Sequence, residues 1–306
     1  MSVYLDNAAT TPLDPLVLEA MLPYLSDVYG NPSSTHGHGR SARTAVETSR
    51  KTVAQIMGVA PSEIYFTSGG TEADNTFLNG AVNSLDVTRI ITSRIEHPAI
   101  LQTAEHLKQS RNIEVAYVQL DSKGGIDLDH LFELMDKKGN SLVTLMHANN
   151  EIGNLLNLSE VSDMAERTKT IFHTDAVQTV GHQPIRLDEV EVHGLSASAH
   201  KFHGPKGHGF MFVRQGYPLD QLIRGGSQER SMRGGTESVH GIVGTAKALE
   251  LATVQLQDDI VHISGLKQRM IALLKKEISG VTFNGYSADF DKSNYTVLSL
   301  SLIHIS

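Results

Sequence analysis

Seven short runs of β-branched and apolar residues recur along this chain, and most are separated by stretches with helical apolar spacing. Ala73, Phe77, Ala81 and Leu85 form one such helical pattern. Strands that alternate with helices predict an α/β fold, in which a mainly parallel sheet is covered by helices on both faces. The expected strands are residues 63–67, 89–93, 113–118, 141–146, 170–174, 193–198 and 209–213.

The pattern changes near Gly241, where one long helical segment begins and runs through Ile278. Two strand-like runs, 281–283 and 295–303, follow it. A strand at the terminus with no helix after it leaves a two-layer unit half covered, so we expect a smaller, incomplete second domain. We expect a buried stripe on the long helix, made of Ile260, Ile263, Leu266, Met270, Leu273 and Leu274.

These patterns predict three parts of the chain. Residues 1–14 are expected to form an N-terminal segment of the small domain, residues 15–245 a large domain that binds the ligand, and residues 246–306 a partial C-terminal small domain.

Composition excludes several functions. The 306 residues carry 26 Lys and Arg against 34 Asp and Glu, a net charge of −8, which argues against a nucleic-acid or anionic-membrane surface. No apolar run approaches the roughly 20 residues of a membrane span, and the N-terminus does not resemble a secretion signal. We therefore expect a cytoplasmic protein. With no cysteine and no zinc-like spacing among the 15 histidines, we expect no metal site.

Polar residues follow five of the expected strands, where the loops of an α/β sheet converge on a ligand. Residues 67–71 (TSGGT) suit an anion cradle with Gly70 and Thr71 at a helix N-terminus, although an ordinary capped turn has the same pattern. His97 precedes a proline that can open a helix, and it is either a proton-transfer group or a loop histidine. Asn150 follows another of these strands.

Asp175 and Lys201 complete the five positions. Asp175 either keeps a heterocyclic nitrogen protonated, with Gln178 near the adjacent ring oxygen, or caps a helix. Lys201 is either an exposed charge or an imine-forming amine beside the phosphate donors Ser198 and His200, and Lys206 competes for that role. A glycine-rich loop carries Arg224, Arg230 and Arg233 and is either a solvated loop or an anion clamp.

At these residues the chain resembles the cysteine desulfurases, the NifS/IscS-like branch of the class V aminotransferases. No single motif is specific, but the ordered series is. It consists of YLDNAATTP (4–12), YGNPSSTHGHGR (29–40), FTSGGTE (66–72), EH (96–97), NNEIG (149–153), DAVQ (175–178), SAHK (198–201) and RGGTE (233–237).

The resemblance implies a fold-type-I pyridoxal phosphate transferase. In such an enzyme Lys201 binds the cofactor as an imine and moves protons, and His97 stacks on the ring as an acid/base. Asp175 pairs with the ring nitrogen and Gln178 with the ring hydroxyl oxygen, while Asn150 lies beside the ring and the substrate carboxylate. The phosphate is held by Gly70, Thr71, Ser198 and His200, and by Thr236 from the partner subunit of a homodimer.

The implied reaction converts L-cysteine to L-alanine and passes sulfur, through an enzyme persulfide, to an acceptor protein for iron–sulfur cluster assembly or tRNA thiolation. The family's nucleophilic cysteine and its carboxylate-binding arginine belong to a C-terminal segment that these residues do not contain. We therefore expect a truncated and inactive chain. A related class V aminotransferase, a selenocysteine lyase and a non-catalytic fragment remain alternatives.

Overall fold

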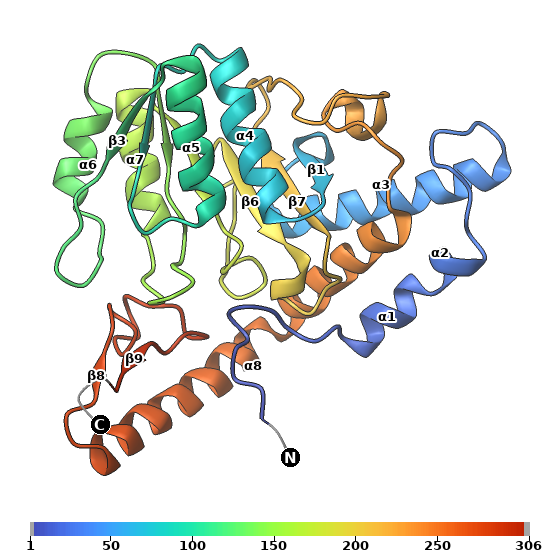
Figure 1. Cartoon of the computed structure of the whole chain (residues 1–306). Coiled ribbons are helices and arrows are strands. Elements are labelled where there is room, and N and C mark those ends of the chain that lie inside the picture. Colours follow the sequence, from blue (N-terminus) through green and yellow to red (C-terminus); the bar gives the residue numbers. More distant parts are fainter. Residues whose placement is uncertain (1–2, 303–306) are drawn as a thin grey trace.

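The computed structural model describes residues 3–302, and a seven-stranded sheet forms its centre (Figure 1). All seven expected strands are confirmed. The strand order is β1-β7-β6-β5-β4-β2-β3, and β7 is antiparallel to both of its neighbours while the other pairings are parallel. The strands are β1 (Ile64–Thr67), β2 (Arg89–Thr92), β3 (Glu114–Tyr117), β4 (Ser141–Thr144), β5 (Ile171–Asp175), β6 (Gly194–Ser198) and β7 (Gly209–Val213).

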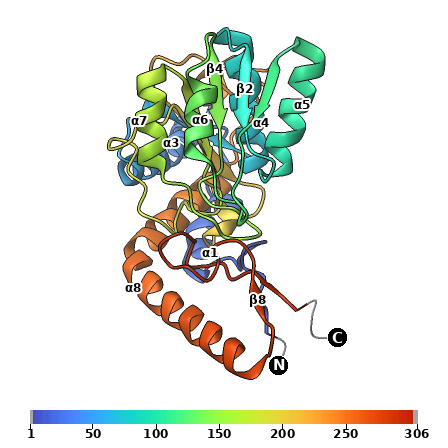
Figure 2. The ribbon, with the colours of Figure 1, turned by 90° about the vertical axis from the view of Figure 1, so that its left-hand side faces the viewer.

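Helices cover both faces of this sheet, as expected (Figures 1 and 2). One face packs on α4 (Gly70–Ser84) and α5 (Pro98–Arg111). The other packs on α3 (Gly37–Met57), α6 (Leu128–Met135), α7 (Leu158–Thr168) and the first part of α8 (Val239–Glu277). Short helices complete the description: α1 (Pro15–Met21), α2 (Pro23–Ser26), and the 3₁₀ turns η1 (Pro61–Glu63), η2 (Ala199–Lys201) and η3 (Gln228–Ser231).

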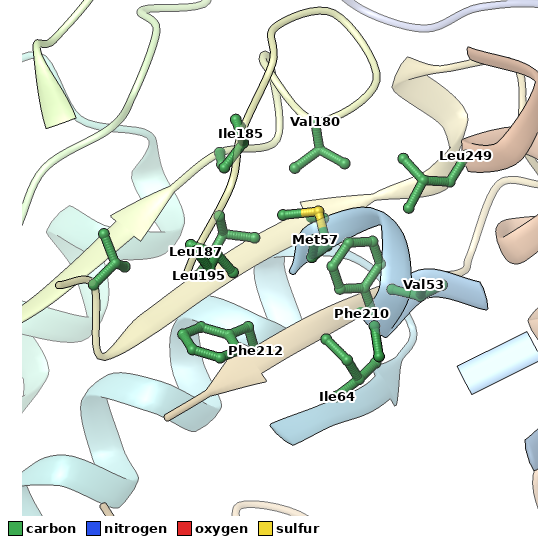
Figure 3. Close-up of a cluster of buried hydrophobic side chains, with 14 of the residues drawn as sticks. Val53, Met57, Ile64, Val180, Ile185, Leu187, Leu195, Phe210, Phe212 and Leu249 are labelled. Carbon is green, nitrogen blue, oxygen red and sulfur yellow. The ribbon is translucent and has the colours of Figure 1, made fainter. Parts of the chain in front are cut away.

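Alternating side chains of β7 show why the sheet is buried on both sides. Phe210 and Phe212 point into the cluster that contains Val53 and Met57 of α3, whereas Met211 packs with α4 and α5 (Figure 3). Full burial of one such side chain contributes roughly 1.5–3 kcal/mol. This two-sided core holds the strand ends, and the loops that follow them, in fixed positions.

The long helix α8 has two different halves. Its first half is buried against α3 and includes Ile242 and Leu249. Our expectation of a buried stripe in the second half is wrong for Leu266, Met270 and Leu273, which are 44–52% exposed, whereas Ile260, Ile263 and Leu274 are half-buried. The buried positions there are Lys267 and Ile271, which continue the face of Ile260, Ile263 and Leu274 at spacings of three and four residues.

Two short strands, β8 (Thr282–Phe283) and β9 (Leu300–Ser301), form an antiparallel pair after α8. The expected strand at 295–303 is therefore much shorter, because Asn294 and Val297 close a hydrogen-bonded turn; residue 303 lies outside the described range. Since α8 runs unbroken across residue 245, no chain break marks the predicted domain boundary, which stays a prediction. Within residues 3–302, no helix has both the length and the hydropathy that crossing a bilayer requires.

Candidate active site

The loops after β1, β2, β4, β5 and β6 meet at the carboxyl edge of the sheet and surround a cavity of about 550 Å³. Because these strands are parallel to one another, their carboxyl ends share this edge. Thr236 lies elsewhere, on a separate cavity of about 220 Å³ beside β1. The other nine predicted residues all line the larger cavity: Gly70, Thr71, His97, Asn150, Asp175, Gln178, Ser198, His200 and Lys201.

The turn from β1 into α4 forms the expected cradle. Gly69 has a φ of +141°, and a Cβ on Gly70 would lie 2.4 Å from the Val177 side chain, so both positions require glycine. The Ser198 hydroxyl oxygen is 3.4 Å from where a Gly69 Cβ would be. The N-terminus of α4 and a serine hydroxyl thus face one space, an arrangement that binds anions.

Lys201 leaves β6 through η2 and reaches into the cavity. Its Nζ donates to the carbonyl oxygens of Ala8 and Ala9, the latter at 3.0 Å. Burial lowers the pKa of Lys201, although Asp175 and Asp6 oppose this. A lowered pKa leaves more free amine for nucleophilic attack. Lys206 is not among the residues that line this cavity, and its Nζ lies 3.5 Å from the Thr11 carbonyl oxygen.

The Asp175 carboxylate ends β5 and is almost fully buried. Its Oδ1 accepts a hydrogen bond from the Val177 N–H at 3.0 Å. Burial raises the pKa of Asp175, while the Val177 N–H and the nearby His97 and Lys201 lower it. The carboxylate orders a turn and caps no helix, and it also lines the cavity; its pairing with a ring nitrogen stays a prediction.

Two histidines are oriented by contacts outside the cavity. His97 caps α5, where its Nδ1 accepts from the Ala99 N–H at 3.1 Å, so the neutral ring carries its proton on Nε2. His200 Nδ1 lies 3.0 Å from the Thr10 hydroxyl. Burial lowers the pKa of His200, and Lys201 and Lys206 act in the same direction.

The N-terminal segment also lines the cavity, which our sequence analysis did not assign. Asp6, Ala8 and Ala9 are part of its wall, and the Gln178 amide donates to the Ala8 carbonyl oxygen at 3.0 Å. The motif at residues 4–12 was the available signal, but its contact with the strand loops depends on the tertiary fold.

Two buried carboxyl groups were also missed: Asp74, which lines the cavity, and Glu96, which does not. Asp74, in α4, is 1% exposed, and its Oδ1 has no hydrogen-bond partner within residues 3–302. Burial and the adjacent Asp175 raise its pKa well above the usual range. Glu96 accepts from the Ser93 hydroxyl at 2.7 Å and from the Met146 N–H at 2.8 Å, and burial raises its pKa to about 8. We expect Glu96 to hold a proton near neutral pH.

Known proteins identify this arrangement. The family model for class-V aminotransferases matches residues 3–306. The cysteine desulfurase IscS of Dictyoglomus turgidum is 46% identical over 285 residues, which cover 92% of this chain and 72% of that protein. The cysteine desulfurase IscS of Methanosarcina thermophila is 41% identical over 298 residues, which cover 97% of this chain and 73% of that protein. The chain belongs to the cysteine desulfurases.

Solved structures agree with this assignment. A NifS-like protein superposes with a TM-score of 0.93 at 40% identity, over 98% of this chain and 82% of that chain. DndA from Streptomyces lividans superposes with a TM-score of 0.86 at 33% identity, and the match covers 99% of this chain and 86% of that chain. A structure of SspA in complex with cysteine superposes with a TM-score of 0.77 at 37% identity, and the match covers 81% of this chain and 72% of that chain. The mainly parallel, helix-flanked sheet is that of the fold-type-I pyridoxal phosphate enzymes.

In this desulfurase chain, the arginines of the glycine-rich loop are engaged by acidic side chains. Arg224 pairs with Asp220, Arg230 with Glu47, and Arg233 with Glu72 in the first turn of α4. None of the three arginines is among the residues that line the 550 Å³ cavity. The loop is therefore tied to α4 beside the anion cradle without supplying a free arginine to it.

Proposed function

We propose that the 550 Å³ cavity binds pyridoxal 5′-phosphate through Lys201 and uses it to desulfurate L-cysteine. The observation that carries this proposal is the convergence of an amine with a lowered pKa, a buried carboxylate and a glycine-lined helix N-terminus on one cavity. These groups match the aldehyde, the ring nitrogen and the phosphate of that cofactor.

The chain's residues fit this cofactor. Gly70, Thr71, Ser198 and His200 would hold the phosphate at the start of α4. Asp175 would keep the ring nitrogen protonated, and the Gln178 amide would donate to the ring oxygen in place of its bond to Ala8. Among the carboxyl groups that line the cavity, Asp175 has His97 and Lys201 near enough to lower its pKa and so favour the charged form that the ring nitrogen requires.

Bound pyridoxal phosphate supplies an electron sink for bonds around the amino-acid Cα. Lys201, as the free amine, would move the proton between Cα and the cofactor, and His97 would act as acid or base from its Nε2. Asn150 lines the same wall and would face the ring and the substrate carboxylate. Surrounding protein, including Ala8 and Ala9, would limit the access of water.

L-cysteine is the proposed substrate because the relatives are cysteine desulfurases and a solved relative is described in complex with cysteine. The products would be L-alanine and a persulfide sulfur that an acceptor protein uses for iron–sulfur cluster assembly or tRNA thiolation. We further propose a homodimer in which Thr236, exposed and remote from this cavity, reaches the phosphate of the partner's site.

Substitution of the two candidate lysines tests the proposal. The protein should gain a visible absorbance band with pyridoxal phosphate, and Lys201→Ala should abolish it. Lys206→Ala is the control and should retain the band. Loss of the band in Lys206→Ala with retention in Lys201→Ala would overturn the assignment.

A further inference from the structure

The segment after α8 lies beneath the loops at the lower edge of the large sheet in both views (Figures 1 and 2). Asn294, in this segment, is 0% exposed although its side chain and peptide groups are polar. Each of its four hydrogen-bonding groups has a partner in a distant part of the chain. A buried polar residue satisfied in this way fixes the position of what it touches.

The Asn294 side chain clamps the turn that carries Gln178. Its Nδ2 donates to the Gln178 backbone carbonyl oxygen at 2.9 Å, and its Oδ1 accepts from the Gln183 side-chain Nε2 at 3.2 Å. These two contacts are five residues apart, at either side of the turn that follows Asp175. The amide therefore holds the backbone from which the Gln178 side chain projects into the cavity.

The Asn294 backbone is held in place independently. Its N–H donates to the Gly153 carbonyl oxygen at 2.8 Å, next to the loop of Asn150, and Ser293 pairs with Asn154. Its carbonyl oxygen accepts from Lys267 Nζ of α8 at 3.0 Å. The Asn294 backbone is thus bonded to the loop that carries Asn150 and to α8, while its side chain bonds to the turn that carries Gln178.

We infer that Asn294 is a positioning residue that sets the backbone of the Gln178 turn and, through it, the contact between Gln178 and the ligand in the cavity. It does not line the cavity and acts only through the turn. The contact between Gln178 and the cofactor ring rests on the proposed function; the clamping of the turn does not.

Asn294→Ala tests the inference because it removes both side-chain bonds and retains the backbone bonds. In the cofactor-free protein, hydrogen–deuterium exchange should rise in residues 176–183, where the N–H groups of Thr179, Val180, His182 and Gln183 bond within the turn, and should change little in residues 149–154. The pyridoxal phosphate affinity should fall about tenfold, equivalent to about 1.4 kcal/mol. The pH midpoint of the visible band should also shift, since Gln178 would no longer be held at the ring oxygen.

Two variants separate positioning from general destabilisation. Lys267→Met removes the α8 contacts but leaves the Asn294 amide intact, so it should lower stability with normal affinity and an unchanged band midpoint. Asn294→Asp keeps the size and the acceptor for Gln183 but has no donor for the Gln178 carbonyl, so it should behave like Asn294→Ala.

Unchanged exchange at 176–183 in both Asn294 variants would overturn the inference, as would an equal midpoint shift in Lys267→Met. A parent protein that binds no pyridoxal phosphate would instead refute the proposed function, and the exchange measurement would still decide whether Asn294 holds the turn.

Discussion

The Arg50 guanidinium and the Glu229 carboxylate form a two-pronged ion pair inside the protein. The Nη1–Oε2 and Nη2–Oε1 distances are 2.7 and 2.9 Å, and the two residues are 1% and 4% exposed. Arg50 also donates to the Ile64 carbonyl oxygen, and Glu229 accepts from the Phe66 N–H. The pair therefore joins α3, β1 and the glycine-rich loop, where Glu229 has an unfavourable φ of +45°.

Glu229→Gln should lower the free energy of unfolding by about 3–5 kcal/mol, because it removes the buried anion that pairs with the buried Arg50 charge. Denaturant unfolding of the cofactor-free protein measures this. Glu47→Gln is the matched control: Glu47 also contacts Arg50 but is 41% exposed, so its loss should cost about 1 kcal/mol or less. Equal effects of the two substitutions would contradict the assigned role of the buried pair.

Asp175→Asn should impair chemistry more than cofactor retention. The carboxylate acts on the ring nitrogen, whereas the phosphate cradle at Gly70 supplies most of the anchoring. Pyridoxal phosphate affinity should fall only a few-fold, while exchange of the alanine Cα proton with deuterated solvent, followed by NMR, should fall by orders of magnitude. Equal losses in the two measurements would count against this division of roles.

Glu96 should make stability fall as the pH rises from 4.5 to about 8. Burial raises the pKa of Glu96 from 4.5 to about 8, so the folded protein holds a proton that the unfolded chain releases. This contribution is complete below pH 4.5 and is lost as the pH rises towards 8. The free energy of unfolding should therefore decline with pH by up to about 1.4 kcal/mol per unit from this group.

Glu96→Gln resembles the protonated carboxyl and should flatten that decline. The measurement is denaturant unfolding at several values between pH 7 and 8.5, which avoids the acid range where buried His147 and His173, with pKa values of about 4 and 3, must gain protons. Glu133→Gln, at an exposed position, should keep the parent slope. A Glu96→Gln slope equal to that of the parent would show that Glu96 is already ionised.

Local patterns predicted the strands and most of the cavity. β-branched runs mark the strands, and polar residues after a parallel strand must lie at one edge, so Lys201 and Asp175 were found together. Asp74 was missed because a carboxyl in a helical pattern gives no sign of burial. Glu229 was missed because its partner, Arg50, is 179 residues away in the sequence.

The second half of α8 contains apolar residues that were expected to be buried and are exposed. Its apolar residues have helical spacing, which favoured burial of Leu266 and Met270, yet the helix buries Lys267 instead. Lys267 can be buried because its Nζ donates to Ser293 Oγ and to the Asn294 carbonyl oxygen, both at 3.0 Å. Those acceptors lie just before the run that sequence periodicity predicted as a strand, in a segment to which no structure was assigned, so burial of Lys267 could not be predicted.

The last prediction concerns sulfur. A polypeptide of these 306 residues contains no cysteine, and no other side chain replaces a thiolate as the acceptor of sulfur from cysteine. We expect it to bind pyridoxal phosphate but to form no protein-bound persulfide. Incubation with L-cysteine in the absence of added thiol, followed by assays of alanine and of protein-bound sulfur, measures this.

A graft supplies the positive control for that experiment. The C-terminal segment of the Dictyoglomus turgidum desulfurase, of which this chain spans 72%, would be joined after Val297, a buried residue that packs on Gly153. Persulfide that forms only in the graft, and disappears when Lys201 is replaced by Ala, would show that the cavity drives the chemistry and that the thiol was the missing part. Abundant persulfide on the ungrafted chain would refute the prediction, because its sulfur would need an acceptor that the composition excludes.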